Sequence, residues 1–300
     1  MLLSQFIREA ARALEALYPP QEARSLVARL VEDLCGLKPY EHVVRPELEA
    51  PSELAPALER LLAGEPVQYV TGVQEFYGRR FHVAPGVLIP RPETELLVRE
   101  ACVRALALES PHVLDLCTGS GCIAWSIALE VPGSVVTGVD VSDDALAVAR
   151  VQKPYVLHPE GGKMRESCAN GDGFAHADPV FVKADVLCTS LALPGAPFDI
   201  LVANPPYIRE SERAAMHRNV LEHEPALALF VPDADPLVFY RAIAAHALAS
   251  LRPGGWGIVE INEALGAETA AVFEAAGFAS VQIMRDFFER DRFVTFTLRA

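Results

Sequence analysis

The sequence has little that would mark a membrane or secreted protein. Charges, glycines or prolines interrupt its apolar runs well before the roughly 20 residues that a membrane span requires. Residues 1–17 carry acidic side chains at helical spacing, whereas a signal peptide has a basic start and an apolar core. We therefore expect a cytoplasmic protein without a membrane anchor.

Cysteine pairs are also absent. The sequence contains no CxxC motif and no histidine-rich spacing beside a cysteine, and this favours reduced thiols. Cys117 and Cys122 lack the second pair of ligands that a structural zinc site would need, so we expect no metal. The six cysteines are Cys35, Cys102, Cys117, Cys122, Cys168 and Cys188.

Basic residues are in the minority. The chain has 26 Lys and Arg against 40 Asp and Glu, and its net charge of −14 repels phosphate backbones. Stable nucleic-acid binding is therefore disfavoured, although an acidic protein would suit a basic protein partner. With 300 residues, 51% of them hydrophobic, the chain has the material for two globular domains, and we expect a monomer.

The first 66 residues favour a helical domain without a catalytic motif. Apolar side chains recur there every three or four residues, which places them on one buried face of a helix. Aromatic and β-branched residues with glycines then predict a β-hairpin linker over 67–90. The three helical stripes are Phe6, Ile7, Ala10, Leu14 and Leu17; Ala23, Leu26, Val27, Leu30, Val31 and Leu34; and Leu54, Leu58, Leu61 and Leu62.

Residues 91–300 favour an α/β domain, because strand-like runs alternate with helical ones, as in a parallel sheet covered by helices on both faces. The segment 151–179 has no clear period and predicts a long loop between the second and third strands. The last two runs suit an antiparallel edge pair, which makes the sheet mixed. The seven runs are HVLDL, SVVTGVD, FVKAD, FDILVAN, GWGIVEI, SVQIMRD and FVTFTLR.

The turn after the first of these strands predicts a nucleoside site. Gly119 and Gly121 let the backbone approach a ligand closely, and the helix that starts after Gly121 offers unpaired N–H groups. Such a turn opens onto the crevice where α/β sheets bind ligands. The other candidate cofactor residues of this turn are Asp115, Cys117, Thr118 and Ser120.

Two later strands end in acids that suit the same ligand. Asp140 ends the second strand, where its carboxylate can accept hydrogen bonds from both ribose hydroxyls. Asp185 ends the third strand, where its side chain and neighbouring amides, including that of Val186, can hold an adenine edge. The loop lacks the third glycine of a dinucleotide fingerprint, but spacing alone leaves a dinucleotide, or a turn without a ligand, open.

The sequence Asn204-Pro205-Pro206-Tyr207 follows the fourth strand, so it opens onto the same edge. A conjugated amide or amino nitrogen is a poor nucleophile, because its lone pair is delocalised. The Asn204 side-chain oxygen and the Pro205 carbonyl can accept its two N–H groups and favour the positive charge that develops as the lone pair localises. Prolines stiffen the turn, and Tyr207 can stack on the planar group. This pattern predicts transfer to a planar nitrogen.

With these motifs in view, the chain resembles the bacterial release-factor glutamine methyltransferases, the HemK or PrmC family. The resemblance covers nearly the whole chain and includes NPPYI, the stretch GEPVQYVTGVQEFYGRRFHVAPGVLIPRPETELLV from Gly64 to Val98, and HEPALAL from His223 to Leu229. It implies the Rossmann-like class I methyltransferase fold with a seven-stranded mixed sheet, S-adenosylmethionine as methyl donor and S-adenosylhomocysteine as product. The implied substrate is the glutamine of the Gly-Gly-Gln motif in peptide chain release factors, which the helical domain would grip.

The resemblance also places Arg91 and Glu93, in the turn RPETE, beside the cofactor as substrate-binding residues, although the two could simply pair with each other. Cys117 stands where many relatives have glycine, a feature of sister enzymes that methylate a ribosomal protein, and Asn262 stands where the family usually has glycine. Glutamine methylation of a ribosomal protein, DNA adenine N6 methylation and cofactor sensing without transfer therefore remain alternatives.

Overall fold

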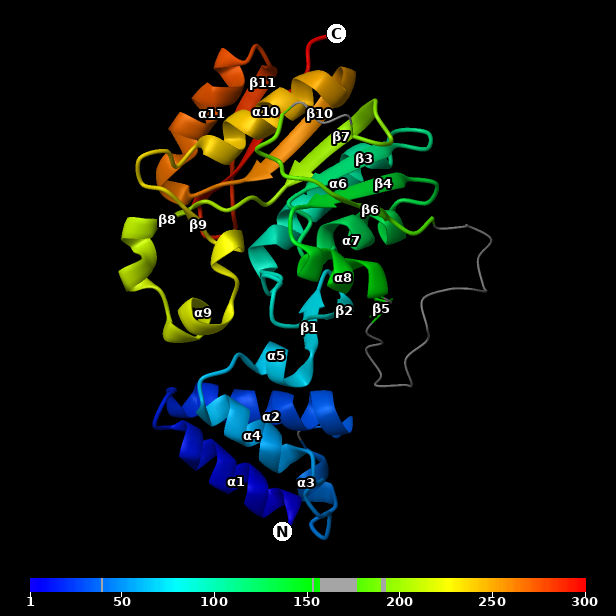
Figure 1. Ribbon diagram of the computed structural model, residues 1–300. Coiled ribbons are helices and arrows are strands. Elements are labelled where there is room, and N and C mark those ends of the chain that lie inside the picture. Colours follow the sequence, from blue (N-terminus) through cyan, green and yellow to red (C-terminus); the bar gives the residue numbers. More distant parts are fainter. Residues whose placement is uncertain (39, 153, 157–176, 190–192) are drawn as a thin grey trace. The chain divides into compact units, whose positions relative to one another are not determined.

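The computed structural model describes residues 1–38, 40–152, 154–156, 177–189 and 193–300, and most of the predicted loop 151–179 lies outside them. The chain divides into two compact units (Figure 1). None of the helices within the described ranges is long and apolar enough to cross a membrane. The helical unit comprises Met1–Val73, Val83–Pro85 and Met216–Glu224, and the sheet unit comprises Gln74–His82, Gly86–Ala215 and Pro225–Ala300.

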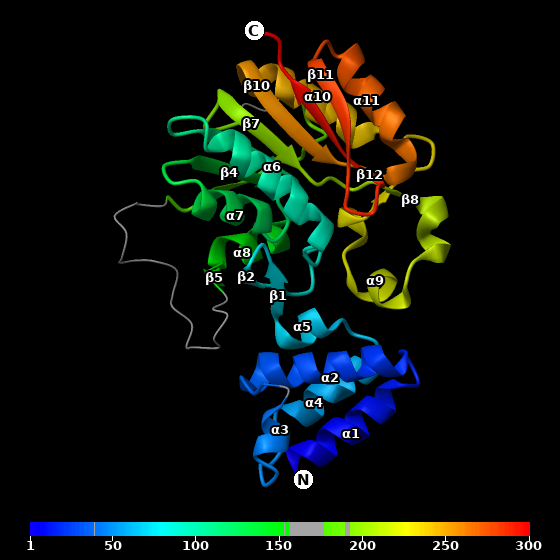
Figure 2. The ribbon, with the colours of Figure 1, turned by 180° about the vertical axis from the view of Figure 1, so that it is seen from behind.

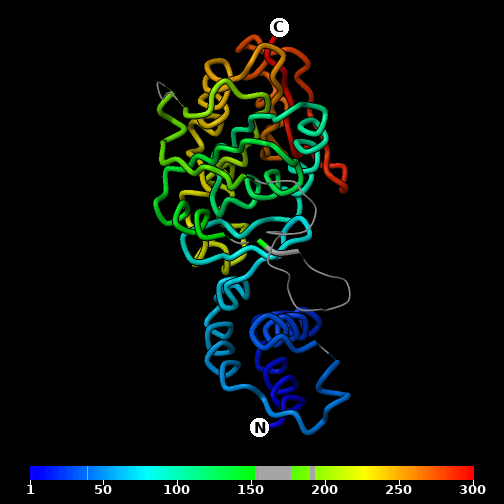
Figure 3. Tube along the Cα trace, turned by 90° about the vertical axis from the view of Figure 1, so that its right-hand side faces the viewer, coloured from blue at the N-terminus to red at the C-terminus, as the bar shows by residue number. Residues whose placement is uncertain are grey.

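The helical unit is built as the apolar spacing predicts, with its N-terminal helices packed against one another (Figure 3). Leu14, Val27 and Leu61, one from each predicted stripe, are fully buried in its core. Leu17, in the turn after α1, and Leu62, the last residue of α4, remain exposed. The helices of this unit are α1 (Leu3–Leu14), α2 (Pro20–Cys35), α3 (Glu41–Val44), α4 (Leu54–Leu62), α5 (Val67–Thr71) and α9 (Arg218–His223).

Helix α9 belongs to the helical unit although it is distant from the other helices in sequence. The Asn219 side-chain amide donates a hydrogen bond to the Tyr18 phenol oxygen at 2.6 Å. The ring of His217 stacks on the same tyrosine, with centroids 6.3 Å apart. An aromatic contact and a hydrogen bond therefore fasten this returning segment to the bundle.

The predicted hairpin is present, but it is shorter than the predicted 67–90. Strands β1 (Val73–Phe76) and β2 (Arg79–His82) pair with each other, and β2 also pairs with β5 (Tyr155–Val156). The residues just before β1 form helix α5, although β-branched side chains favour a strand there. Val67 and Val70 are buried in the helical core, so packing overrides local propensity.

The sheet unit contains a seven-stranded mixed sheet in the order β11-β12-β10-β7-β3-β4-β6. Neighbours from β6 to β10 run parallel, whereas β12 is antiparallel to both β10 and β11. The predicted Rossmann-like class I methyltransferase fold is confirmed, including the antiparallel edge pair. The strands are β3 (His112–Leu116), β4 (Val135–Asp140), β6 (Val180–Lys183), β7 (Phe198–Ala203), β10 (Leu251–Glu260), β11 (Ala279–Arg285) and β12 (Asp291–Thr297).

Helices cover both faces of this sheet. One face carries α6 (Glu95–Ala105) and α7 (Cys122–Glu130) (Figure 2). Their apolar side chains share one buried cluster with alternate residues of the strands. The other face carries α10 (Val238–Ser250) and α11 (Gly266–Ala275). The remaining elements are α8 (Asp143–Val151), the short parallel strands β8 (Ile208–Arg209) and β9 (Phe230–Val231), and the 3-10 helices η1 (Pro92–Thr94), η2 (Glu210–Ala215), η3 (Ala226–Ala228) and η4 (Glu263–Leu265).

Candidate active site

A cavity lies at the carboxyl edge of the sheet, where parallel strands β3, β4, β6 and β7 end. Its lining contains residues from the turn after each of these strands, Gly119, Asp140, Asp185 and Asn204 among them. This is the crevice in which α/β sheets generally bind ligands. The sequence-predicted residues that line it are Arg91, Cys117, Thr118, Gly119, Ser120, Asp140, Asp185, Val186, Asn204 and Pro206.

Two glycines shape the turn after β3: Gly119 leaves open space, and Gly121 allows close packing. Both have a left-handed backbone, with φ values of 55° at Gly119 and 78° at Gly121. A Cβ at Gly119 would meet nothing within 4 Å, so the turn leaves open space there. A Cβ at Gly121 would lie 3.0 Å from both the Ala149 Cβ and the Phe181 ring, so this glycine permits close packing where α7 begins.

Asp115 lies beneath this turn and does not line the cavity. Its side chain is fully buried and accepts a hydrogen bond from the Thr118 hydroxyl at 2.5 Å. Burial raises the pKa of Asp115 to about 7, although hydrogen bonds from Thr118 and the Ala124 amide oppose the rise. The carboxyl group thus supports the turn from below.

Asp140 connects the end of β4 to the same turn. One carboxylate oxygen accepts the Gly119 N–H at 2.8 Å, and the other accepts the Ser142 N–H at 2.9 Å. Burial raises the pKa of Asp140, and these amides oppose the rise. Each oxygen retains a lone pair, so the group can bind backbone and still accept from a ligand hydroxyl at the cavity wall.

The turn after β6 supplies one polar residue, Asp185, and one apolar residue, Val186, to the cavity lining. A carboxylate oxygen of Asp185 accepts the Leu187 N–H at 2.9 Å, which fixes the turn after β6. Val186 is buried, and its carbonyl lies 2.9 Å from the His246 Nε2 atom on α10. The turn is therefore held against the helix layer, and both Asp185 and Val186 line the cavity.

The Asn204–Tyr207 turn is divided between the cavity and the protein interior. Asn204 and Pro206 line the cavity, whereas Pro205 and Tyr207 do not. The Tyr207 hydroxyl donates to a Glu260 carboxylate oxygen at 3.0 Å, and burial raises the pKa of this tyrosine well above its ordinary value. Stacking of its ring on a substrate remains a prediction.

Only some residues of the RPETE turn line the cavity. Arg91 and Thr94 line the cavity, but Glu93 does not. Sequence reasoning singles out neither Thr94 nor Glu260, yet Thr94 bonds both Asn204 and Glu260. The only signal for Glu260 is a lone acid near the end of the apolar run GWGIVEI.

Asn262 departs from the family pattern and has several hydrogen bonds. Its side-chain nitrogen donates to the Tyr207 carbonyl at 3.2 Å and to a Glu212 carboxylate oxygen at 2.9 Å. Its side-chain oxygen accepts the Ala264 N–H at 3.0 Å, which caps η4. Among the described residues, no group of three or more His, Cys, Asp and Glu could hold a metal ion.

Comparison with known proteins finds close relatives along the whole chain. Residues 5–72 match a family model described as the PrmC N-terminal domain. The chain is 38% identical to the release factor glutamine methyltransferase of Bacteroides thetaiotaomicron, with 98% of each chain covered. It is 35% identical to the protein of the same name from Flavobacterium psychrophilum, with both chains covered completely.

A crystal structure from Alicyclobacillus acidocaldarius, of a release factor-specific protein-(glutamine-N5) methyltransferase, is also similar. Its sequence is 28% identical to this chain, and the match covers 73% of this chain and 100% of that one, with a TM-score of 0.41.

Proposed function

The chain belongs to the release factor glutamine methyltransferase family, and from this we propose that it methylates the side-chain amide nitrogen, N5, of the glutamine in the Gly-Gly-Gln motif of peptide chain release factors. The methyl donor is S-adenosylmethionine and the product is S-adenosylhomocysteine. Because release factors act in translation, the reaction takes place in the cytoplasm. The helical unit, whose residues 5–72 match the family's N-terminal domain, contacts the release factor.

One observation supports this proposal above the others: a single cavity is lined by the Gly119 turn, by Asp140 and by Asn204. The first two suit a nucleoside, and the third suits a planar amide. A donor and an acceptor that share one cavity can meet without crossing solvent, and such proximity is a large part of catalysis.

The residues around the cavity fit the methyl donor. The open space at Gly119 admits the chain that carries the sulfonium, Asp140 accepts from the ribose hydroxyls, and Asp185 with Val186 borders the adenine. Cys117, Thr118 and Ser120 complete the wall, while Asp115 and Gly121 act indirectly by shaping the turn. The bound donor supplies an electrophilic methyl group.

Asn204 and Pro205 prepare the substrate nitrogen. The Asn204 side-chain oxygen and the Pro205 carbonyl accept the two N–H groups of the glutamine amide, which turns the nitrogen lone pair toward the methyl group. As the lone pair leaves conjugation, positive charge develops on the nitrogen, and both oxygens stabilise it. Pro206 and Arg91, which line the cavity, border the place where the glutamine enters. Tyr207 and Glu93 lie outside the lining, and their contact with the glutamine is a prediction from the sequence.

Substrate identity is tested by incubation with labelled S-adenosylmethionine and three candidate acceptors: a purified release factor, ribosomal proteins and adenine-containing duplex DNA. We expect label on the Gly-Gly-Gln peptide and none when its glutamine is replaced by glutamate. Label on a ribosomal protein alone would move the assignment to the sister enzymes, and label on DNA alone would contradict glutamine methylation.

The role of Asn204 is tested by Asn204→Ala. We expect turnover to fall by about 10²-fold or more, as it does when a group that stabilises transition-state charge is removed. Affinity for the cofactor, measured by calorimetry, should be nearly unchanged. Unchanged turnover would remove Asn204 from the mechanism.

A further inference from the structure

Asn204 is bound through two further side chains to a buried acid. Its side-chain nitrogen donates to the Thr94 hydroxyl oxygen at 3.2 Å, and the Thr94 hydroxyl donates to a Glu260 carboxylate oxygen at 2.6 Å. Thr94 is 3% exposed and Glu260 is 1% exposed. Water therefore has little access to these hydrogen bonds, and the protein groups themselves determine which atom donates in each one.

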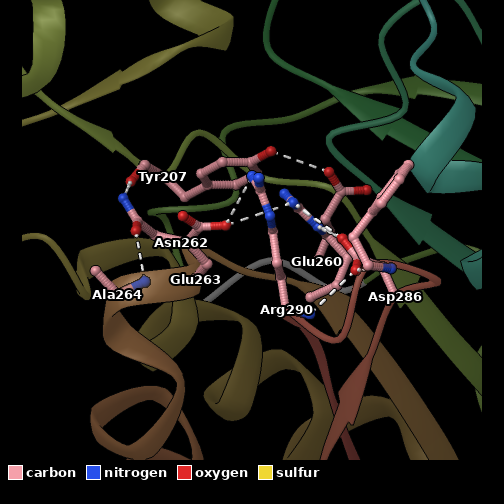
Figure 4. Close-up of polar contacts among 9 residues, drawn as sticks. Tyr207, Glu260, Asn262, Glu263, Ala264, Asp286 and Arg290 are labelled. Carbon is pink, nitrogen blue, oxygen red and sulfur yellow. Dashed lines mark hydrogen bonds and ion pairs between the residues drawn. The ribbon is translucent and has the colours of Figure 1, made fainter. Parts of the chain in front are cut away.

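Glu260 lies at the end of β10 and also holds the end of the Asn204–Tyr207 turn. Its other carboxylate oxygen accepts the Tyr207 hydroxyl at 3.0 Å, and Figure 4 shows this phenol directed at Glu260. In the same view the Asn262 side chain reaches the Tyr207 carbonyl from the opposite end of that residue. Tyr207 is thus fixed at both its backbone and its side chain.

Burial raises the pKa of Glu260, and the hydrogen bonds from Thr94 and Tyr207 oppose the rise. With Glu260 ionised, the protons in this chain of hydrogen bonds can be assigned. A carboxylate can only accept hydrogen bonds, so both hydroxyls that reach Glu260 must donate to it. A threonine hydroxyl has one proton, and since Thr94 gives it to Glu260, only its lone pairs face Asn204. The amide of Asn204 must therefore turn its NH₂ toward Thr94.

The consequence concerns the other side of the same amide. With the nitrogen of Asn204 committed to Thr94, its oxygen is the polar atom that remains for the cavity which Asn204 lines. An amide turned the other way would present N–H groups to the N–H groups of a substrate, and donors facing donors do not bond. Nothing in the shape of an asparagine distinguishes the two orientations, so its partners must select one.

We propose that Glu260 is a positioning residue that acts through Thr94 to fix the side-chain amide of Asn204 with its oxygen toward the substrate nitrogen. This inference rests on the proposed function, because it assumes that the acceptor is an N–H-bearing amide. Glu260 does not contact the substrate. Through Thr94 it determines which of the two orientations the Asn204 amide adopts, and only one of them is active.

Three variants test the inference. Glu260→Gln replaces an acceptor by a group that can donate to Thr94, so the threonine proton can turn to Asn204 and the amide can invert. Thr94→Val keeps the shape of the threonine and removes its hydroxyl, whereas Thr94→Ser keeps the hydroxyl. We expect Glu260→Gln and Thr94→Val to lower kcat by about 10²-fold, as for loss of the Asn204 oxygen itself. Thr94→Ser should remain near the wild-type rate.

Asp199→Asn is the control for loss of a part-buried, hydrogen-bonded charge away from the cavity. Asp199 lies at the opposite end of β7 from Asn204, where it accepts the His112 N–H at 2.8 Å and pairs with Arg252 at 2.7 Å. Its loss should lower stability without changing kcat. Affinity for S-adenosylmethionine should be unchanged in Glu260→Gln and Asp199→Asn, because neither residue lines the cavity or bonds the Gly119 turn.

The outcomes separate this inference from the proposed function. A wild-type protein that methylates no release factor refutes the function, whereas wild-type activity with undiminished kcat in Glu260→Gln refutes the inference alone. If Glu260→Gln does not fold, equal turnover in Thr94→Val and Thr94→Ser refutes it. A crystal structure of Glu260→Gln with the Asn204 amide inverted supports it whatever the substrate.

Discussion

Replacing Asp115 by asparagine should stabilise the sheet unit above neutral pH. The carboxyl group is fully buried beneath the Gly119 turn, and its pKa is raised from 3.8 to about 7, chiefly by burial. A raised pKa means that the folded protein holds this proton more tightly than the unfolded chain does. Asparagine has nearly the same shape and carries no charge at any of these pH values.

The sign and size of the effect follow from linkage. As pH rises past 3.8 the unfolded chain loses the proton first, so the free energy of unfolding of the wild type falls until pH passes about 7. Each pH unit of this window corresponds to about 1.4 kcal/mol, which gives a penalty of about 4 kcal/mol above pH 7. Asp115→Asn avoids this penalty, so its advantage over the wild type should be larger at pH 8.5 than at pH 5, by roughly 3 kcal/mol.

Tryptophan fluorescence during denaturation in guanidinium chloride reports the unfolding of the sheet unit, which contains Asp115. Both tryptophans, Trp125 and Trp256, are buried in the core of the sheet unit. The exposed Asp178 of the same unit provides the control, because Asp178→Asn removes a carboxylate without removing a buried charge. If the advantage of Asp115→Asn is the same at both pH values, the carboxyl group is not protonated in the folded protein and the reasoning fails.

Two further predictions concern the cavity and the sheet. In Asp140→Asn the side chain has one acceptor oxygen and cannot bond the N–H groups of both Gly119 and Ser142. We therefore expect affinity for S-adenosylmethionine, measured by calorimetry, to fall by roughly 10- to 100-fold. An unchanged affinity would contradict a role of Asp140 in binding. Gly257→Ala places a Cβ against the buried Phe296 ring, which stacks on Phe273 with centroids 4.1 Å apart. We expect the free energy of unfolding to fall by about 1–3 kcal/mol, measured as a lower midpoint of tryptophan-detected unfolding. An unaltered midpoint would show that the ring moves aside freely.

The sheet could be predicted because its strands are buried on both faces. Val113, Leu114 and Leu116 of β3 are all inaccessible to solvent, and such strands appear in a sequence as short continuous apolar runs. Strand β10 begins earlier than predicted, at Leu251, and its pairing with β7 shifts register between Leu251 and Trp256. The run Arg252-Pro253-Gly254 has the composition of a turn, and an irregular strand of this kind has no periodic signal.

The cavity residues could be predicted to a similar extent, because a residue that ends a parallel strand lies at a known edge of the sheet. This reasoning places Asp140 and Asn204 at one cavity. The supporting residues could not be found in the same way. Thr94 and Glu260 are 166 positions apart in the chain, and their contact depends on how the turn before α6 packs beside the end of β10. No local pattern records that arrangement.

The return of α9 to the helical bundle affects how the protein can be divided. Residues 216–224 belong with the first helices, so a fragment beginning after residue 73 would still carry a segment that had lost its support. Tyr18, in turn, would lose the stacked His217 ring and the hydrogen bond from Asn219 in a fragment ending at residue 73. Neither unit can be made by a single cut in the gene, because the helical unit consists of three separate stretches of the chain.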